Sequence, residues 1–368
     1  MNPRKPDHER LGRTLRDDIL HGDIWSSLRL DFRELKDFYI DDEKKARLEK
    51  MNWLKRTLYL FWWYIKILLL RLTPARRVLL LIGMLLIITS GNIAWQAGTV
   101  RSNPETYLLG GAILVFVLML ELKDKLLARS ELQAGRSVQY ALMPPACPDI
   151  PEWDVWLHSE PANDVGGDLV DYIKLNDSCH ALAIGDVAGK GLRAALLMGK
   201  LQATIRALVP GYASLPDLML HINRIFIRDS LRSIFASLVY LEINSQDKLV
   251  RMVNAGHMPL LFIKKQSNVI EKVGIQAPAL GIVPDAEYSE LSVGLTQGDV
   301  LIAYSDGVTE ARNQNGMFFG EDRLMRVLRQ NAHLSTEQIG QKILKEIIWF
   351  RGDARIYDDI SMIIIKPL

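Results

Sequence analysis

The stretch VGGDLVDY (residues 165–172) is the first of four segments that decide the fold, and the others are GDVAGKG (185–191), YSDGVTE (304–310) and DDIS (358–361). Each segment places an aspartate at or beside the end of an apolar, strand-like run, where a tight turn can hold a carboxylate at the edge of a sheet. Carboxylates gathered at one sheet edge supply the oxygen ligands that Mg²⁺ and Mn²⁺ prefer. The four segments therefore predict a site for two cations, suited to the hydrolysis of a phosphate ester.

The order of the segments is more specific than any one of them, because a single Asp-Gly turn is common. They are interleaved with AGHMP (255–259), PALGI (278–282) and FFGEDRL (318–324). This set resembles the PPM family of metal-dependent serine/threonine protein phosphatases, in its bacterial SpoIIE/RsbU-like branch. The resemblance extends from about residue 131 to the C-terminus and includes a helix-then-proline entry at 137–145.

The region after residue 146 mixes strand and helix patterns. Apolar, β-rich runs predict strands at 180–184, 237–243, 260–263, 299–304 and 360–365. Helical spacing predicts helices at 191–208, 216–231, 321–331 and 335–350. Strands largely follow strands and helices come in pairs, which indicates an α+β fold. The resemblance implies two antiparallel sheets sandwiched between helix pairs in a phosphatase domain spanning 146–368.

The resemblance also implies a role for each aspartate. Asp186 would bridge two Mn²⁺ or Mg²⁺ ions, with the backbone carbonyl of Val187 as a further ligand. Asp168 would lie on the side of one metal, and Asp306 and Asp358 would serve the other. No organic cofactor is expected.

Elementary electrostatics agrees with this ligand set. Four carboxylates in a low-dielectric cleft repel one another, and two divalent cations offset that repulsion. Water bound between the cations has a lowered pKa, so hydroxide can attack phosphorus, and Asp168 and Asp186 would act through this water. No protein nucleophile is then needed. The two cysteines, Cys147 and Cys179, lack metal-ligand spacing and are expected to be free, buried or half-buried thiols.

Neighbouring residues leave alternatives open. Lys190 either reaches the phosphate or is a solvated lysine on a turn, and Asp359 either coordinates metal or supports the site by hydrogen bonds. Gly166 and Gly167 allow the backbone to come close to the metals and their water. His257 is either a general acid or a residue that holds a turn.

The N-terminal third predicts a membrane module. Residues 78–100 and about 105–122 are long apolar runs, and together they predict a two-helix transmembrane hairpin within 73–122. The alternative is a pair of buried helices in a soluble domain. We expect no cleavable signal peptide, because the apolar runs begin far from the N-terminus.

Positive charge predicts the orientation of this hairpin. Arg76 and Arg77 precede the first span, and Lys123 and Lys125 follow the second. Both termini are therefore expected in the cytoplasm, with the chain as a multi-pass protein of the cytoplasmic (inner) membrane. Residues 1–57 form a charged tail.

The segment 58–72 is rich in aromatic residues and is flanked by positive charge. We interpret it as an amphipathic helix lying in the membrane interface, with a third span as the alternative.

The residues between membrane and phosphatase domain predict a linker. Residues 123–145 form a regulatory helix by resemblance, and the apolar positions of 121–143 favour a homodimer contact or packing on the helix's own domain. The net charge of +2 gives no reason to expect nucleic-acid binding.

The predicted function is therefore a membrane-anchored phosphatase. By resemblance, it would act on phosphoserine or phosphothreonine of a cytoplasmic regulatory protein, an anti-sigma-factor antagonist of the STAS type. The alternative is a catalytically weak, phosphatase-like binding module in partner-switching signalling.

Overall fold

The computed structural model describes residues 69–92, 104–230, 234–265, 267 and 269–368, with isolated positions between 52 and 66. The chain divides into two compact units, Met1–Lys123 and Asp124–Leu368. The predicted tail at 1–57 falls almost entirely outside the described residues, and the end of the first predicted span, 93–100, falls outside them. The predicted interfacial helix at 58–72 is described only at isolated positions up to residue 66 and from residue 69 onward.

The first unit contains a closely packed pair of helices. They are α5 (Pro74–Asn92) and the first part of α6 (Pro104–Leu142). A Cβ atom added at Gly110 would lie 2.9 Å from the carbonyl oxygen of Gly83, so the two backbones approach where only glycine fits. Near the other end of the pair, Arg76 Nη1 donates to Glu121 Oε1 at 2.7 Å.

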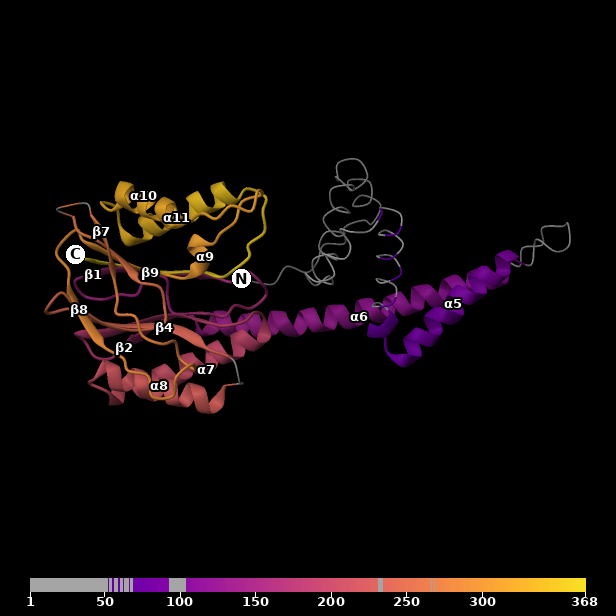
Figure 1. Ribbon diagram of the computed structural model, residues 1–368, viewed down its shortest axis with the longest axis horizontal. Helices are drawn as coiled ribbons and strands as arrows, with labels where there is room; N and C mark the ends of the chain where they lie inside the picture. Colours follow the sequence, from indigo (N-terminus) through magenta and orange to yellow (C-terminus); the bar gives the residue numbers. More distant parts are fainter. Residues whose placement is uncertain are drawn as a thin grey trace. The chain divides into compact units, whose positions relative to one another are not determined.

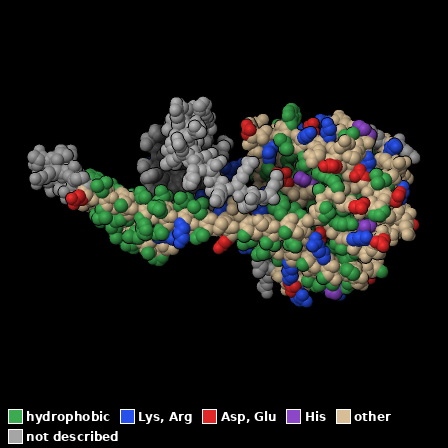
Figure 2. Space-filling view, turned by 180° about the vertical axis from the view of Figure 1, so that it is seen from behind, with side chains coloured by type: hydrophobic (Ala, Val, Ile, Leu, Met, Phe, Trp, Pro, Cys, Tyr) green, Lys and Arg blue, Asp and Glu red, His purple; other side chains and the backbone are tan. Residues whose placement is uncertain are grey.

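The outer surface of this pair is apolar, as Figure 2 shows by its cover of hydrophobic side chains. Exposed members include Leu81, Leu85, Ile88, Leu108, Leu109, Val115, Phe116 and Leu118. Among the described residues, α6 alone is long and apolar enough to cross a membrane, judged by length and composition. The predicted segments 105–122 and 123–145 thus belong to one helix, which is continuous to Leu142.

The second unit is built on two five-stranded antiparallel sheets, within the ranges described. The first sheet has the order β1 (Trp153–Glu160), β10 (Ile360–Pro367), β9 (Val300–Tyr304), β6 (Leu260–Ile263) and β7 (Ile270–Val273). The second has the order β2 (Asp168–Lys174), β3 (Cys179–Val187), β4 (Ala236–Asn244), β5 (Leu249–Ala255) and β8 (Glu290–Gly294). A short helix, α9 (Asp306–Thr309), follows β9 directly.

Helices cover the outer face of each sheet (Figure 1). The pair α7 (Leu192–Leu208) and α8 (Leu215–Asp229), joined by the short helix η2 (Val209–Gly211), lies on the second sheet. The pair α10 (Glu321–Asn331) and α11 (Thr336–Arg351) lies on the first sheet. These four layers confirm the α+β sandwich predicted from the sequence.

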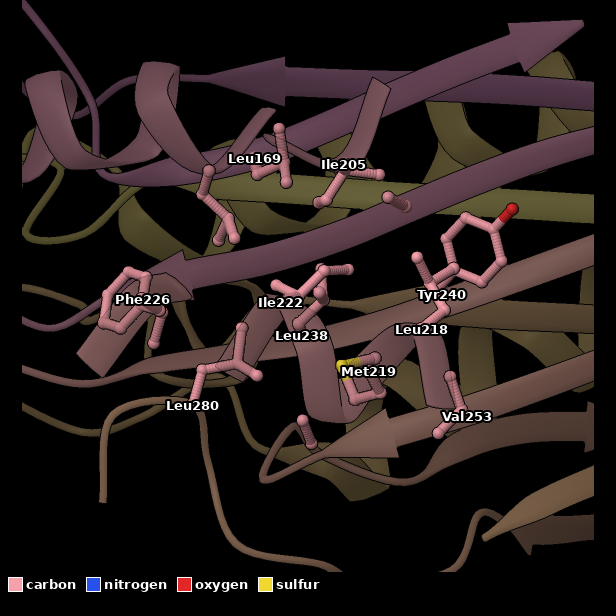
Figure 3. Close-up of a cluster of buried hydrophobic side chains, with 14 of the residues drawn as sticks. Leu169, Ile205, Leu218, Met219, Ile222, Phe226, Leu238, Tyr240, Val253 and Leu280 are labelled. Carbon is pink, nitrogen blue, oxygen red and sulfur yellow. The ribbon is translucent and has the colours of Figure 1, made fainter. Parts of the chain in front are cut away.

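Three buried clusters hold the layers together. One lies between the sheets, one lies under α10 and α11, and the third lies under α7 and α8, where Ile205, Leu218 and Met219 meet Leu238 and Tyr240 (Figure 3). Each fully buried Leu or Ile side chain contributes about 1.5–3 kcal/mol by leaving water. The interior is therefore a rigid support for the strand ends.

Local signals fix the helix ends. Ser214 caps α8 by accepting a hydrogen bond from the Asp217 backbone N–H, and Ser335 with Gln338 forms a capping box at the start of α11.

The predicted secondary structure is confirmed. The helices predicted at 191–208, 216–231, 321–331 and 335–350 are α7, α8, α10 and α11. The predicted strands correspond to β3, β4, β6, β9 and β10.

Candidate metal centre

Strand register brings the predicted carboxylates to one end of the sandwich. Asp168 begins β2 and pairs directly with Asp186 near the end of β3. In the other sheet, Asp306 follows the end of β9 and Asp358 precedes the start of β10, which are neighbouring antiparallel strands. Both sheets therefore present carboxylates at the same edge.

The carboxylates perturb one another, which shows that they are close. Burial raises the pKa of Asp168 well above the usual carboxyl range, and the charges of Asp186 and Asp359 raise it further. Burial likewise raises the pKa of Asp186 to about 6, helped by Asp306 and Asp358. Clusters of titratable groups with strongly shifted pKa values are typical of functional sites.

The second pair is more accessible than the first. Burial raises the pKa of Asp306, and the charge of Asp358 adds to this effect. Lys190 Nζ donates to Asp358 Oδ2 at 2.9 Å and to the Tyr357 carbonyl at 2.6 Å. Lys190 is thus held against a predicted metal ligand, rather than being a freely solvated lysine.

Asp359 organises the loop that leads into β2. Its Oδ1 accepts from the Ala162 N–H at 2.7 Å, and its Oδ2 accepts from the N–H groups of Gly167 at 2.6 Å and Asp168 at 3.3 Å. A Cβ at Gly166 would lie 2.5 Å from the same Oδ2. Of the two roles left open for Asp359, the geometry favours support by hydrogen bonds.

Gly167 brings the backbone close to the centre itself. A Cβ there would lie 3.1 Å from the Val187 carbonyl oxygen and 3.5 Å from Asp186 Oδ1. The missing side chain leaves space beside two of the predicted ligand atoms, as a bound cation with its water requires.

His257 holds a turn. Its Nε2 donates to the Tyr304 carbonyl at 3.0 Å and its Nδ1 accepts from Ser237 Oγ at 2.8 Å, while its backbone N–H donates to Asn254 Oδ1. Burial lowers the pKa of His257 to about 4, so the ring is neutral near pH 7. With both ring nitrogens already used, the turn-holding role is favoured over general acid catalysis.

Gln139 is a site residue that sequence reasoning missed. It lies on α6 and is buried, and its side chain forms two hydrogen bonds with Gly166: Nε2 donates to the carbonyl at 2.9 Å, and Oε1 accepts from the N–H at 3.1 Å. The partners are 27 residues apart, and no local pattern links them. The linker helix thus contacts the glycine pair before Asp168.

The residues fit divalent cations. Asp168 Oδ2 is buried and accepts no hydrogen bond from any residue in the described part of the chain, which leaves a lone pair directed at no partner. All candidate ligand atoms are oxygens, the donor set of Mg²⁺ and Mn²⁺. Within the described ranges, no three His, Cys, Asp or Glu side chains form a single cluster that could hold a metal ion.

Neither cysteine has the surroundings of a catalytic thiolate. Both are free, but Cys147 is exposed, contrary to the expectation of buried or half-buried thiols, while Cys179 is half-buried. Desolvation raises the pKa of each thiol, which is the opposite of what a catalytic thiolate needs.

Comparison with known proteins agrees with this arrangement. The family Stage II sporulation protein E (SpoIIE) matches residues 176–367. The chain is 29% identical over 311 residues to Protein IcfG of Synechocystis, covering 75% of this chain and 49% of IcfG, so it spans about half the length of that relative. It is 26% identical over 238 residues to phosphoserine phosphatase RsbU of Bacillus subtilis, covering 65% of this chain and 70% of RsbU.

A solved structure shares the fold. The SiaA-PP2C domain of Pseudomonas aeruginosa matches with a TM-score of 0.59 at 18% identity, covering 66% of this chain and 98% of that domain. The residues matched by the family, 176–367, run from β3 to the end of β10 and include Asp186, Asp306 and Asp358. The chain belongs to the SpoIIE family, within the SpoIIE/RsbU-like branch of the PPM (PP2C-type) protein phosphatases.

Proposed function

We propose that the chain is a metal-dependent protein phosphatase that hydrolyses phosphoserine or phosphothreonine on a cytoplasmic regulatory protein. The observation that carries this proposal is the meeting of two sheets at one edge, where Asp168 and Asp186 from one sheet face the Asp306–Asp358 pair of the other. Family membership and the shared fold support it.

Four side chains and one carbonyl would hold two Mn²⁺ or Mg²⁺ ions: Asp168, Asp186, Asp306, Asp358 and the backbone oxygen of Val187. When bound, the two cations would neutralise the carboxylates and activate water for attack on phosphorus. The ammonium of Lys190, held beside Asp358, would contact the phosphate.

Metal removal tests the proposal. The full-length protein with Mn²⁺ is expected to release phosphate from a phosphoserine peptide. Excess EDTA should reduce this release to background, because no side chain of the protein can activate water in place of the cations. Restoring Mn²⁺ should restore release. Activity that is equal before and after chelation would contradict the metal-dependent function.

The substrate is proposed to be a small phosphoprotein. RsbU is named a phosphoserine phosphatase. The similarity of this chain to RsbU favours the hydrolysis of phosphoserine here as well. We infer a partner of the anti-sigma-factor antagonist class, with a STAS-type protein as the specific candidate.

We propose that α5 and α6 form a transmembrane hairpin with both chain termini in the cytoplasm. The support is the close Gly83–Gly110 approach together with the apolar outer surface of the pair. Apolar side chains on the outside of a helix pair favour a lipid environment.

Cell fractionation checks this proposal. The protein is expected to remain in membranes after carbonate extraction, because a hairpin with an apolar outer surface is solvated by lipid. A reporter inserted at Asn103 should behave as extracytoplasmic and one fused after Leu368 as cytoplasmic. Two cytoplasmic reporters would contradict the hairpin.

We also propose that α6 regulates the metal centre and contributes to a homodimer through 121–143. The support for regulation is the contact from Gln139 to Gly166, next to the Asp168 loop. The support for a dimer contact is that Leu122, Leu126 and Val138 on the same helix are exposed. At the end of the same helix, the Leu142 carbonyl accepts hydrogen bonds from Gln202 and Arg206 on α7. Movement of α6 would therefore be transmitted to both β2 and α7.

Replacing Gln139 with alanine tests this coupling. The change is expected to weaken Mn²⁺ affinity about 10- to 100-fold, the usual effect of losing a group that orients a metal ligand. Gln133→Ala is the matched control, because Gln133 is exposed on the same helix. Unchanged metal affinity and turnover in Gln139→Ala would show that α6 is a passive tether.

A further inference from the structure

A stack of three side chains stands beside the metal centre, and we call it the rim stack. Arg312 follows α9 and forms a bridge with Phe318. Its guanidinium carbon lies 4.8 Å from the centre of the Phe318 ring and 5.3 Å from the centre of the Tyr357 ring. The rim stack therefore consists of Arg312, Phe318 and Tyr357.

The segment that carries the stack is well ordered by its own hydrogen bonds. Asn313 Oδ1 accepts from the backbone N–H groups of Asn315 and Met317, each at 3.0 Å. Gly316 has a positive φ of 77°, which permits the tight turn at this point. Arg312 is thus presented by a defined turn, so little ordering is needed when a partner binds.

The charge of Arg312 is not neutralised locally. No carboxylate in the described part of the chain forms an ion pair with it. A guanidinium has five N–H donors, and a pair of them matches the two oxygens of a carboxylate or phosphate. The arginine is exposed, as are Phe318 at 48% and Tyr357 at 56%.

The position of the stack relates it to the substrate. Tyr357 immediately precedes Asp358, and its carbonyl accepts a hydrogen bond from Lys190. Arg312 contacts the ring of Tyr357, the residue before Asp358, so the rim stack is linked to a predicted metal ligand through one peptide bond.

We propose that the rim stack is a specificity-determining element, in which Arg312 binds a carboxylate next to the phosphoserine of the protein substrate. The inference rests on the proposed phosphatase function. The neighbouring apolar surface fits this role, because Met317 is also exposed and interface centres are enriched in arginine, methionine and aromatic residues. The favoured partner is therefore a phosphoprotein with acidic residues around its phosphoserine.

Two phosphoserine peptides test this proposal with the full-length protein and Mn²⁺. They differ only in carrying Glu or Gln on both sides of the phosphoserine. The unaltered protein is expected to favour the Glu peptide in kcat/KM by about tenfold, the size expected for a charge-assisted hydrogen bond. Arg312→Ala should bring the ratio near one, and Tyr357→Leu should reduce it, while Arg329→Ala, an exposed arginine on α10, should keep it.

The outcomes separate the two claims. Release from both peptides without preference for Glu, or an Arg312→Ala protein that keeps the preference, overturns the inference and leaves the phosphatase function standing. The absence of release from both peptides and from p-nitrophenyl phosphate overturns the proposed function, and the inference with it. If Arg312→Ala does not fold, Tyr357→Leu provides the same comparison with the charge retained.

Discussion

Replacing Asp186 with asparagine is expected to abolish measurable phosphate release in the presence of Mn²⁺. Asp186 pairs with Asp168 across two strands, and its pKa is raised by burial and by the carboxylates of the other sheet. A neutral amide cannot replace the anionic oxygen that the proposed metal site requires of Asp186. Loss of groups that only orient metal ligands already costs about 10- to 100-fold, so removal of the central ligand should cost well over about 100-fold.

The control for this variant is Asp177→Asn. Asp177 lies in the turn at the opposite end of the same β2–β3 hairpin, and its side chain is fully exposed. It should leave phosphate release unchanged. If Asp186→Asn retains full turnover, the centre is not the catalytic one, and a phosphatase-like binding module becomes the better interpretation.

Adjacent aspartates are expected to respond in opposite ways to the same substitution. Asp359→Asn should lower the free energy of unfolding by about 2–4 kcal/mol, because three backbone N–H groups now donate to its two oxygens and an amide leaves at least one of them unpaired. Asp358→Asn should lower phosphate release with little effect on stability, because its side chain is 44% exposed, pairs with an exposed lysine and accepts one further hydrogen bond, from the Asp359 N–H at 3.2 Å, which an amide oxygen can also accept.

Urea unfolding of both variants, with phosphate release measured in parallel, checks this contrast. If Asp359→Asn unfolds at the same urea concentration as the unaltered protein, the Asp359 carboxylate does not organise the loop before β2. A stability loss in Asp358→Asn as large as that in Asp359→Asn would contradict the division of roles.

The sequence was sufficient for the parts of the fold with strong local signals. Strands β6 and β9 consist entirely of buried residues, and their runs were predicted as 260–263 and 299–304. Strands β1, β5, β7 and β8 were not among the predicted runs, and β7 and β8 carry exposed charged or small residues and are stabilised by their neighbours in the sheet. The four carboxylates could be singled out because each lies at or beside the end of a recognisable apolar run.

Of the residues that support the site, Asp359 was singled out from the sequence with its role left open, and Gln139 was missed. Gln139 and Asp359 act through hydrogen bonds to a loop that is remote from them in the chain, by 27 residues for Gln139 and 192 for the bond from Asp359 to Gly167. The pairing of Arg206 with the fully buried Asp171 is similarly remote. Such contacts follow from tertiary packing, and no spacing rule encodes them.

Equilibrium binding of Mn²⁺ to the full-length protein tests the central claim most directly. The account predicts two ions per chain at pH 7.5, fewer for Asp186→Asn, and weaker binding as pH falls through about 6, where protons compete for Asp186. Binding that is absent, or that is identical in the parent protein and Asp186→Asn, would contradict the account.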